Sequence, residues 1–172
     1  MEIGVEELVD REKIRDCLAR LSRGEDRRDA ALIKGCYWPG ALDDHGVFVG
    51  TAEEFLAWVV PGMSAVPVTL HTLGQSLIQL HGERAAVETH VTAYHRINMN
   101  GPERDIVIGG RYLDRMEKRN REWRIAHRTM LYDWLSDFGE SAEWSKGLLG
   151  MPFLRNNCVG SARGDHSEAF FG

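Results

Sequence analysis

The chain has 172 residues, of which 43% are hydrophobic and 27% charged, and its net charge at pH 7 is -5. This composition is typical of one globular domain that can bury a core. Its net negative charge, together with the lack of a cluster of basic residues in the sequence, argues against nucleic acid or an anionic membrane as the main partner.

The cysteines and the first residues give expectations about the compartment. Cys17, Cys36 and Cys158 are far apart and odd in number, so they predict neither a disulfide framework nor a zinc ribbon. The acidic start lacks a long apolar stretch, and no apolar run approaches the roughly 18 residues needed to span a membrane. We therefore expect a cytoplasmic protein with no membrane partner.

The first third of the chain predicts three helices. Apolar residues recur at helical spacing over Glu6 to Arg23, with Gly24 as a stop signal. A short helix follows from about Asp29 and ends at Pro39-Gly40, which opens a strand over residues 41–49. Thr51 is the expected N-cap of a third helix, which Pro61-Gly62 ends.

The second half predicts four long antiparallel strands. Short turns separate segments rich in Val, Ile, Thr, Tyr and Trp, which cover residues 66–80, 84–97, 105–116 and 122–134. Gly109 and Gly110 lie within one strand, where glycines permit curvature or a bulge. Three helices followed by a curved antiparallel sheet is an α+β arrangement.

The chain is expected to divide at residue 138. Residues 1–138 form the domain, and residues 139–172 form an extension whose apolar side chains cover a pocket mouth or a neighbouring subunit. From about residue 156 the extension is rich in Gly, Ser and charge, so we expect it to be mobile.

Successive side chains of a strand point to opposite faces of the sheet, and this alternation indicates which residues share a face with candidate functional residues. His71 shares a strand face with Thr69 and Leu73, and Arg128 shares one with Met130 and Tyr132. The last strand is mixed on both faces, so the pattern leaves its interior face open. An Arg among apolar neighbours needs an anionic partner; Arg128 either lies in a pocket or pairs across the sheet with Asp114 or Glu88.

The segments "IRDCLARLSRGEDRRD", "LHTLGQSLIQL" and "IVIGGRYLDRMEKRNREWRIAHRTMLYDW" carry a family resemblance. In their order, they resemble the SnoaL-like branch of the nuclear-transport-factor-2-like superfamily, near the group of dehydrochlorinases and dehydratases. The resemblance covers about residues 6–137. It implies a cystatin-like cone, in which a strongly curved sheet, wrapped by three N-terminal helices, encloses an apolar pocket.

The resemblance also implies the catalytic residues. The family's Asp–His dyad falls on Asp26 and His71, with His71 as base and Asp26 as the group that orients it. The family's pocket arginine falls on Arg128, whereas Leu21 stands where relatives place a Lys or Tyr that assists the leaving group. Asp26 would then point inward while the neighbouring arginines, Arg23, Arg27 and Arg28, face solvent.

The function expected from these residues is a cofactor-independent lyase that acts on a small hydrophobic, aromatic or polycyclic substrate. It would eliminate water, or formaldehyde from a lignin-derived diaryl diol. An isomerase or aldol-type cyclase with the same dyad is one alternative, and a non-catalytic binding protein or oxygenase β-type subunit is another. The expected substrate contacts are Tyr37, His45, Trp58, Leu73, Tyr94, Met130 and Tyr132.

Two further expectations concern metals and assembly. Asp43, Asp44 and His45 form a possible metal cluster, but adjacent strand residues diverge and a solvated turn is the simpler interpretation, so no metal site is expected. Apolar residues such as Ile125 and Leu131 on the outer sheet face predict a homodimer or homotrimer.

Overall fold

The computed structural model describes residues 4–62, 65–98, 100–155 and 158–170. Three helices and six strands follow one another in the chain. Their bounds are α1 Val5–Arg27, α2 Ala30–Cys36, β1 Tyr37–Asp44, β2 Val49–Thr51, α3 Ala52–Gly62, β3 Val68–His81, β4 Arg84–Ile97, β5 Arg104–Arg119 and β6 Glu122–Glu140. Short 3-10 turns at Trp144–Lys146 and His166–Glu168 lie beyond β6. The α+β class is confirmed.

Helix α1 extends one turn further than the sequence predicts. Gly24 does not stop it; the helix ends at Arg27, and the C-cap residue Arg28 adopts a left-handed conformation with φ 53°. Gly24 is buried instead, and a Cβ there would lie 2.9 Å from the Ile33 side chain. The glycine therefore allows α2 to approach α1, and the extra turn carries Glu25 and Asp26 into the interior.

Side-chain caps fix the starts of α2 and α3. The Asp29 carboxylate accepts the Leu32 backbone N–H at 2.9 Å. At α3, the Thr51 hydroxyl accepts the Glu54 N–H at 3.2 Å while the Glu54 carboxylate accepts the Thr51 N–H at 2.7 Å, a reciprocal capping box. The strand after α2 begins at Tyr37, before Pro39-Gly40 rather than after it.

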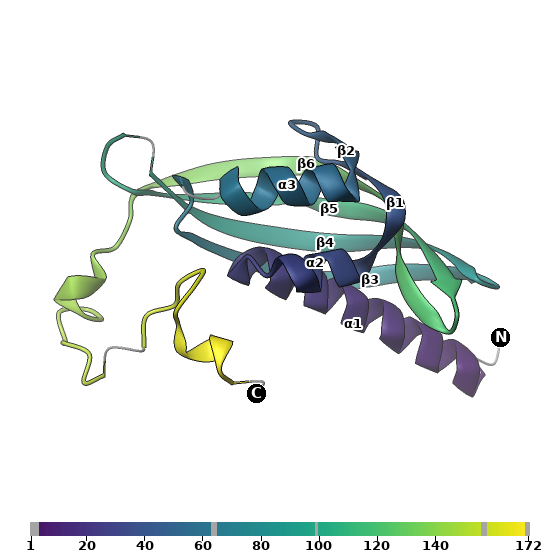
Figure 1. Ribbon diagram of the computed structural model, residues 1–172. Helices are drawn as coiled ribbons and strands as arrows, with labels where there is room; N and C mark the ends of the chain where they lie inside the picture. The colour runs from purple at the N-terminus through teal and green to yellow at the C-terminus, as the bar shows by residue number, and fades with distance from the viewer. Residues whose placement is uncertain (1–3, 63–64, 99, 156–157, 171–172) are drawn as a thin grey trace.

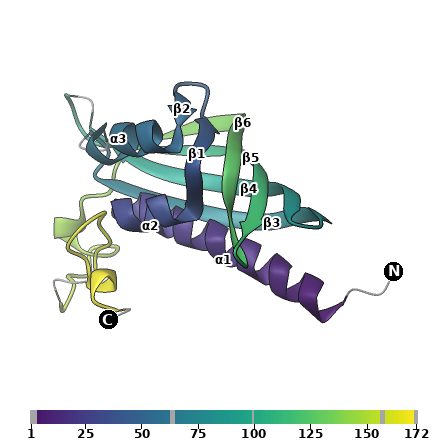
Figure 2. The same cartoon turned by 45° about the vertical axis from the view of Figure 1, so that its right-hand side comes forward.

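The six strands form one sheet in the order β2-β1-β6-β5-β4-β3. The four long strands pair in antiparallel fashion as predicted, but β1 lies parallel to β6, so the sheet is mixed. The three helices lie on one side of it (Figure 1), and the strands curve around them (Figure 2). This is the cone that the resemblance implied.

Bulges change which side chains face the interior. In β3 the register with β4 shifts between Leu73 and Ser76. In β6, Ile125 pairs with Met116 and His127 pairs with Arg115, so β6 has one extra residue between the two pairs. One extra residue reverses the alternation of a strand. In β6 the interior face therefore changes phase after Ile125, which is fully buried in the core and not on the outer face as predicted.

A third bulge lies at the expected glycines. The register between β5 and β6 shifts between Gly109 and Gly110. A Cβ at Gly110 would lie 2.1 Å from the Leu131 carbonyl oxygen, and one at Gly109 would lie 2.0 Å from the Trp134 ring. The two glycines thus permit a close approach of β5 to β6.

Helix α1 also covers the edge of β3, which has a sheet neighbour on one side only. The Arg11 guanidinium donates to the Ile78 carbonyl at 2.8 Å. The His71 backbone N–H donates to the Asp26 carboxylate at 3.1 Å, and Arg28 donates to the Val66 carbonyl just before the strand. Side chains of one helix therefore occupy the backbone groups of an edge strand.

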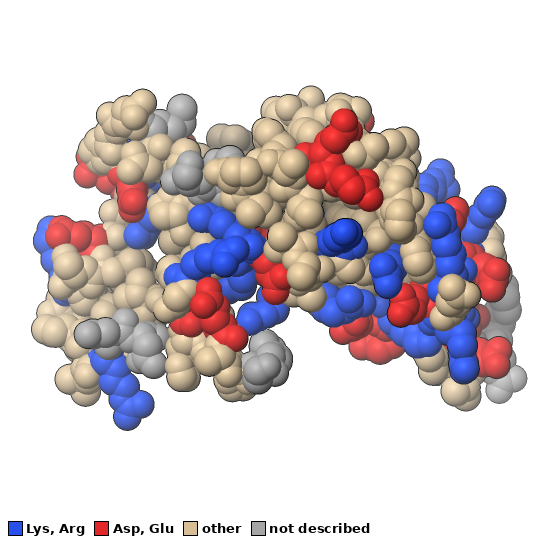
Figure 3. Space-filling view, in the orientation of Figure 1, with Lys and Arg blue, Asp and Glu red and all other residues tan. Residues whose placement is uncertain are grey.

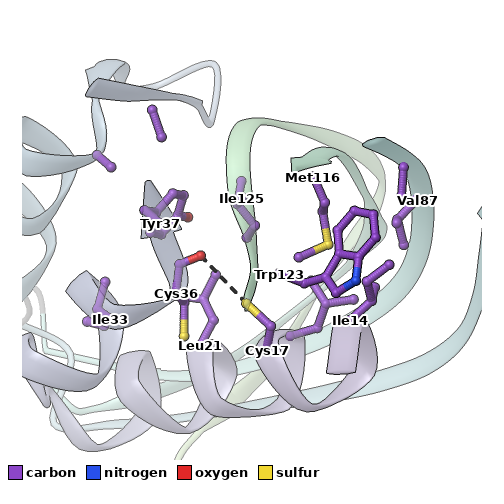
Figure 4. Packing of buried hydrophobic residues seen from close by; sticks show 14 of the residues in the cluster. Ile14, Cys17, Leu21, Ile33, Cys36, Tyr37, Val87, Met116, Trp123 and Ile125 are labelled. Atoms are coloured by element: carbon purple, nitrogen blue, oxygen red, sulfur yellow. Dashed lines mark hydrogen bonds between the residues drawn. The ribbon is translucent and has the colours of Figure 1, made fainter. Parts of the chain in front are cut away.

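The main core fills the space between the helices and the interior face of the sheet (Figure 4). Cys17 and Cys36 are both buried in it as free thiols, and the Cys17 thiol donates to the Cys36 carbonyl at 3.6 Å. Burial against apolar neighbours makes these cysteines packing residues.

The C-terminal segment packs beside the end of α1. Arg23 donates to the Ser167 carbonyl, and Arg27 donates to the Ser161 carbonyl and pairs with Asp165. Figure 3 shows basic side chains gathered between this segment and the body of the molecule. Arg23, Arg27 and Arg28 were expected to face solvent; all three are half-buried and bind backbone carbonyls.

Mobility was predicted from about residue 156; residues 156–157 and 171–172 lie outside the described part of the chain. Among the residues described, no helix is both long and apolar enough to cross a membrane.

Candidate functional site

An apolar cavity of about 320 Å³ opens between α3, the end of α1 and the interior face of the sheet. This volume is at the lower end of the range for small-molecule sites. Its lining consists of Glu25, His45, Val47, Phe55, Trp58, Val59, Val66, His71, Ala93, His95, Ile108, Tyr112, Met130 and Tyr132.

Asp26 and His71 meet at one end of this cavity. The Asp26 Oδ1 lies 2.7 Å from His71 Nδ1, within hydrogen-bond distance. The same carboxylate accepts the Thr69 hydroxyl at 3.1 Å, and its side chain is buried. Three donors from β3 therefore hold the carboxylate, which in turn orients the imidazole.

This contact depends on where the two elements end and begin. Asp26 lies in the last turn of α1, whose final residues are buried, and His71 follows the first residues of β3. Because the bulge in β3 comes after Leu73, His71 keeps the interior face that it shares with Thr69. The contact between Asp26 and His71 is the one that the family resemblance implied.

The surroundings of His71 favour its protonated form. Burial lowers the pKa of His71, but the hydrogen bond to Asp26 and the charges of Glu25 and Asp26 outweigh burial, so its pKa is raised above its ordinary value. The resulting imidazole is a stronger base than a free histidine.

Glu25 is the residue at this end that sequence reasoning missed. Its Oε2 lies 3.7 Å from His71 Nε2, and neither of its buried oxygens has a hydrogen-bond partner among the described residues. Burial raises the pKa of Glu25 despite the nearby charges of His71 and Arg128. Its helical spacing of four from Leu21, a core residue, is the signal that pointed inward.

A second Asp–His pair lies on β1 and in the turn after it. Asp43 is fully buried, accepts the Tyr37 hydroxyl at 2.8 Å, and bonds His45 Nδ1. The His45 ring stacks on Phe55 with 4.9 Å between the centroids. The interpretation of this stretch as a solvated turn is wrong for Asp43 and His45, because the Asp43–Arg128 register turns Asp43 inward.

His95 is a third imidazole in the lining. It stands on the interior face of β4 with Val91 and Ala93, and its ring makes an edge contact with His71 at 6.0 Å. Burial and the charge of His71 lower the pKa of His95 to about 4, so it stays neutral at physiological pH. His95 was not among the predicted site residues, although its alternation with Val91 and Ala93 is a signal for the interior face.

Arg128 lies behind the cavity wall. It is fully buried, and its guanidinium makes two bonds to Asp114, at 2.7 and 2.8 Å. Its guanidinium carbon also lies 3.8 Å from the centroid of the ring of Tyr112, a residue that lines the cavity, whereas Arg128 itself is not part of the lining. Of the two placements that the sequence left open, the structure has the cross-strand pair with Asp114, so we correct the pocket placement.

Aromatic side chains form the wall opposite the sheet. Phe55 and Trp58 come from α3, and Phe48 stacks on Trp58 with centroids 5.3 Å apart. The Tyr132 hydroxyl donates to the His45 carbonyl at 2.9 Å, which fixes the ring at the rim. Of the expected substrate contacts, His45, Trp58, Met130 and Tyr132 line this cavity.

The remaining expected contacts lie elsewhere. Tyr37 is buried, and its hydroxyl donates a hydrogen bond to Asp43. Leu73 packs between the main core and a smaller apolar cluster formed by Val91, Ala93, Tyr112 and Met130. Tyr94 binds Asp105 and borders a different hollow, near the C-terminal segment. Tyr94 alternates with Ala93 and His95 along β4, so it lies on the opposite face of the strand and faces away from the cavity.

Within the described ranges, no group of three or more His, Cys, Asp or Glu side chains is arranged to hold a metal ion. The polar groups of the cavity are instead arranged as imidazole–carboxyl pairs, which suit proton transfer.

Comparison with known families gives one clear match. The profile of a family described as the SnoaL-like domain matches residues 6–129. A search of functionally curated proteins finds no significant match to the chain.

Solved structures share the fold. A hexachlorocyclohexane dehydrochlorinase of LinA type 3 from Novosphingobium barchaimii has a TM-score of 0.70 at 15% identity, covering 88% of this chain and 98% of its own. A candidate scytalone dehydratase from Novosphingobium aromaticivorans has a TM-score of 0.67 at 20% identity, covering 78% and 91%. A cystatin-like protein of unknown function from Nostoc punctiforme has a TM-score of 0.61 at 18% identity, covering 77% and 96%. At these identities the likeness concerns the fold alone.

Proposed function

Since the chain belongs to the SnoaL-like family, within the nuclear-transport-factor-2-like superfamily, we propose that it is a small-molecule lyase that uses His71 as its general base. The observation that carries the proposal is the 2.7 Å contact between Asp26 and His71 in the wall of an apolar cavity. Two solved structures of the same fold are named as a dehydratase and a dehydrochlorinase, which supports an elimination reaction.

The chemistry follows from the geometry of the pair. Asp26 accepts the Nδ1 proton of His71, so the lone pair of Nε2 is available for a substrate proton. As His71 takes that proton, the Asp26 carboxylate stabilises the imidazolium. Electrons from the broken C–H bond form the new double bond, and the leaving group departs with its own electron pair.

The substrate class follows from the cavity. Its walls are aromatic and aliphatic, and its volume of about 320 Å³ suits a compact aromatic or polycyclic molecule. Water is the first proposed leaving group. Release of formaldehyde from a diaryl diol is the alternative. There His71 takes the proton of the terminal hydroxyl group, the C–C bond breaks to release formaldehyde, and the electron pair of that bond forms the new double bond as the second hydroxyl group leaves as hydroxide.

An isomerase or aldol-type cyclase would use the same base and return the proton. Product mass distinguishes it from a lyase, because isomers keep the mass of the substrate. A non-catalytic binding protein or oxygenase β-type subunit would need no imidazole held by a carboxylate, so the Asp26–His71 contact favours the enzyme.

The test compares His71→Ala and Asp26→Asn with the wild type on a panel of hydroxylated, chlorinated and diaryl-diol aromatic substrates, with products measured by mass spectrometry. General-base catalysis contributes about 10²–10⁴-fold, so we expect turnover to fall by that order. His81→Ala, at an exposed position on the end of β3, is the matched control. Turnover at the wild-type rate by both site variants would contradict the proposed function.

A further inference from the structure

The second Asp–His pair has the features of a proton-transfer group. Asp43 has no exposed surface, and its two oxygens bind His45 Nδ1 and the Tyr37 hydroxyl. A buried carboxylate with two such partners keeps its position and holds the imidazole in one tautomer. Asp43 therefore does for His45 what Asp26 does for His71.

The His45 ring is fixed on several sides. It stacks on Phe55 at an interplanar angle of 8°, and Tyr112 meets its edge at 6.1 Å. The Tyr132 hydroxyl binds its backbone carbonyl. Because Nδ1 is engaged by Asp43, Nε2 is the nitrogen left for a ligand, and within the described residues it has no hydrogen-bond partner.

The two imidazoles face one cavity from distant parts of the sheet. His45 follows β1 and His71 lies on β3, with β6, β5 and β4 between the two strands. The side chain of His45 is 15% exposed, against 9% for His71. A molecule in the cavity can therefore contact both rings at separate positions.

We propose that His45, oriented by Asp43 and Tyr37, is the proton donor to the leaving group. This inference rests on the proposed lyase function. His71 takes the proton from carbon, the bond to the leaving oxygen breaks with its electron pair, and the His45 imidazolium gives its Nε2 proton to that oxygen. Water leaves, His45 is neutral and His71 is protonated, and exchange with solvent restores both rings.

Leaving-group chemistry tests the assignment. Hydroxide is a poor leaving group that needs a proton, whereas chloride leaves as a stable anion. On paired substrates that differ only in this group, we expect His45→Gln and Asp43→Asn to lower the rate of water elimination by about 10²–10⁴-fold. Chloride elimination should change less than about tenfold, and His71→Ala should slow both.

The controls separate the two proposals. His127→Gln removes an exposed imidazole from β6 and should leave both reactions unchanged. Equal losses on both substrates, or no loss on either, would overturn the role of His45 while leaving His71 as the base. Retained activity in His71→Ala would instead contradict the lyase mechanism itself.

A second measurement does not require turnover. Nitrogen-15 NMR of the whole chain reports the tautomer of each histidine. We expect the neutral His45 ring to carry its proton on Nδ1, because that nitrogen faces the Asp43 carboxylate. A neutral His45 ring with its proton on Nε2 instead would overturn the proposal.

Discussion

Glu25 places a carboxyl group in the interior without the partners that a buried carboxylate requires. Its oxygens are buried and unbonded within the described residues, and the nearest cation is the imidazole of His71, 3.7 Å away. Such a group lowers stability when it ionises, because burial removes its hydration.

Replacement of Glu25 by Gln should therefore stabilise the protein more at high pH than at low pH. The pKa of Glu25 is raised in the folded state, so the folded state loses stability as the pH rises from about 4.5 through that raised pKa. Glutamine cannot ionise, so it removes the cost of the buried charge that the glutamate acquires as the pH rises. We expect a gain of about 1–3 kcal/mol at pH 8.

Urea unfolding of Glu25→Gln at the two pH values measures this difference. Glu12→Gln, on the exposed side of α1, is the matched control and should change stability by less than about 0.5 kcal/mol at either pH. A loss of stability at pH 8 would mean that the Glu25 carboxylate is held by His71 as an ion pair.

Sequence reasoning reached some of these residues and not others, for physical reasons. The strand pattern and the resemblance placed His71, because the bulge in β3 comes after it. Only the resemblance placed Asp26, which lies in the turn of α1 beyond the predicted helix end. The position of Asp43 depends on the parallel pairing of β1 with β6, which no local pattern encodes. Arg128 was left open because its two placements use the same strand face.

At the scale of elements, the bulges decide which face of each strand is interior. Trp123 and Ile125 point into the core, and beyond the extra residue Arg128 and Met130 take their place. This change of face explains why apolar and polar residues are mixed on both faces of the strand in the sequence. Simple alternation of side chains cannot locate the extra residue, because the sequence fits an interior face on either set of alternating positions.

The bulge at Gly109 and Gly110 gives a test at this scale. We expect Gly110→Ala to destabilise the protein by about 1–3 kcal/mol, because the added methyl would lie 2.1 Å from the Leu131 carbonyl oxygen and the backbone would have to move. Gly101→Ala, in the β4–β5 turn with open space around it, should be close to neutral. Equal midpoints in urea for both variants would show that the bulge relaxes without cost.

At the scale of the molecule, the α+β class and the curved sheet follow from the order of elements in the sequence. The placement of the C-terminal segment does not, because it depends on contacts with arginines of α1 that lie more than a hundred residues earlier. The extension was expected at a pocket mouth or on a neighbouring subunit; the polar bonds described here tie it to its own α1.

The outer face of the sheet carries exposed apolar side chains, which supports the prediction that the protein self-associates. Leu77 on β3 is 65% exposed and borders a shallow hollow that reaches Leu113 on β5. We expect a dimer or trimer in solution, and Leu77→Arg should shift it toward the monomer in size-exclusion chromatography with light scattering. Val5→Arg, at an exposed position on α1, is the control. A wild type that is monomeric at high concentration would contradict the expectation.

The contact of α1 with the edge of β3 has a consequence for aggregation. An uncovered edge strand offers free N–H and C=O groups to a strand of another molecule, and here Arg11 and Asp26 occupy two of those groups. The Asp26 side chain, which orients the His71 imidazole, thus also blocks strand pairing between molecules. Asp26→Asn keeps an oxygen acceptor for the His71 backbone N–H, whereas Asp26→Ala would leave that N–H free at the strand edge. We therefore expect Asp26→Ala to lower the solubility of the protein and Asp26→Asn to leave it unchanged.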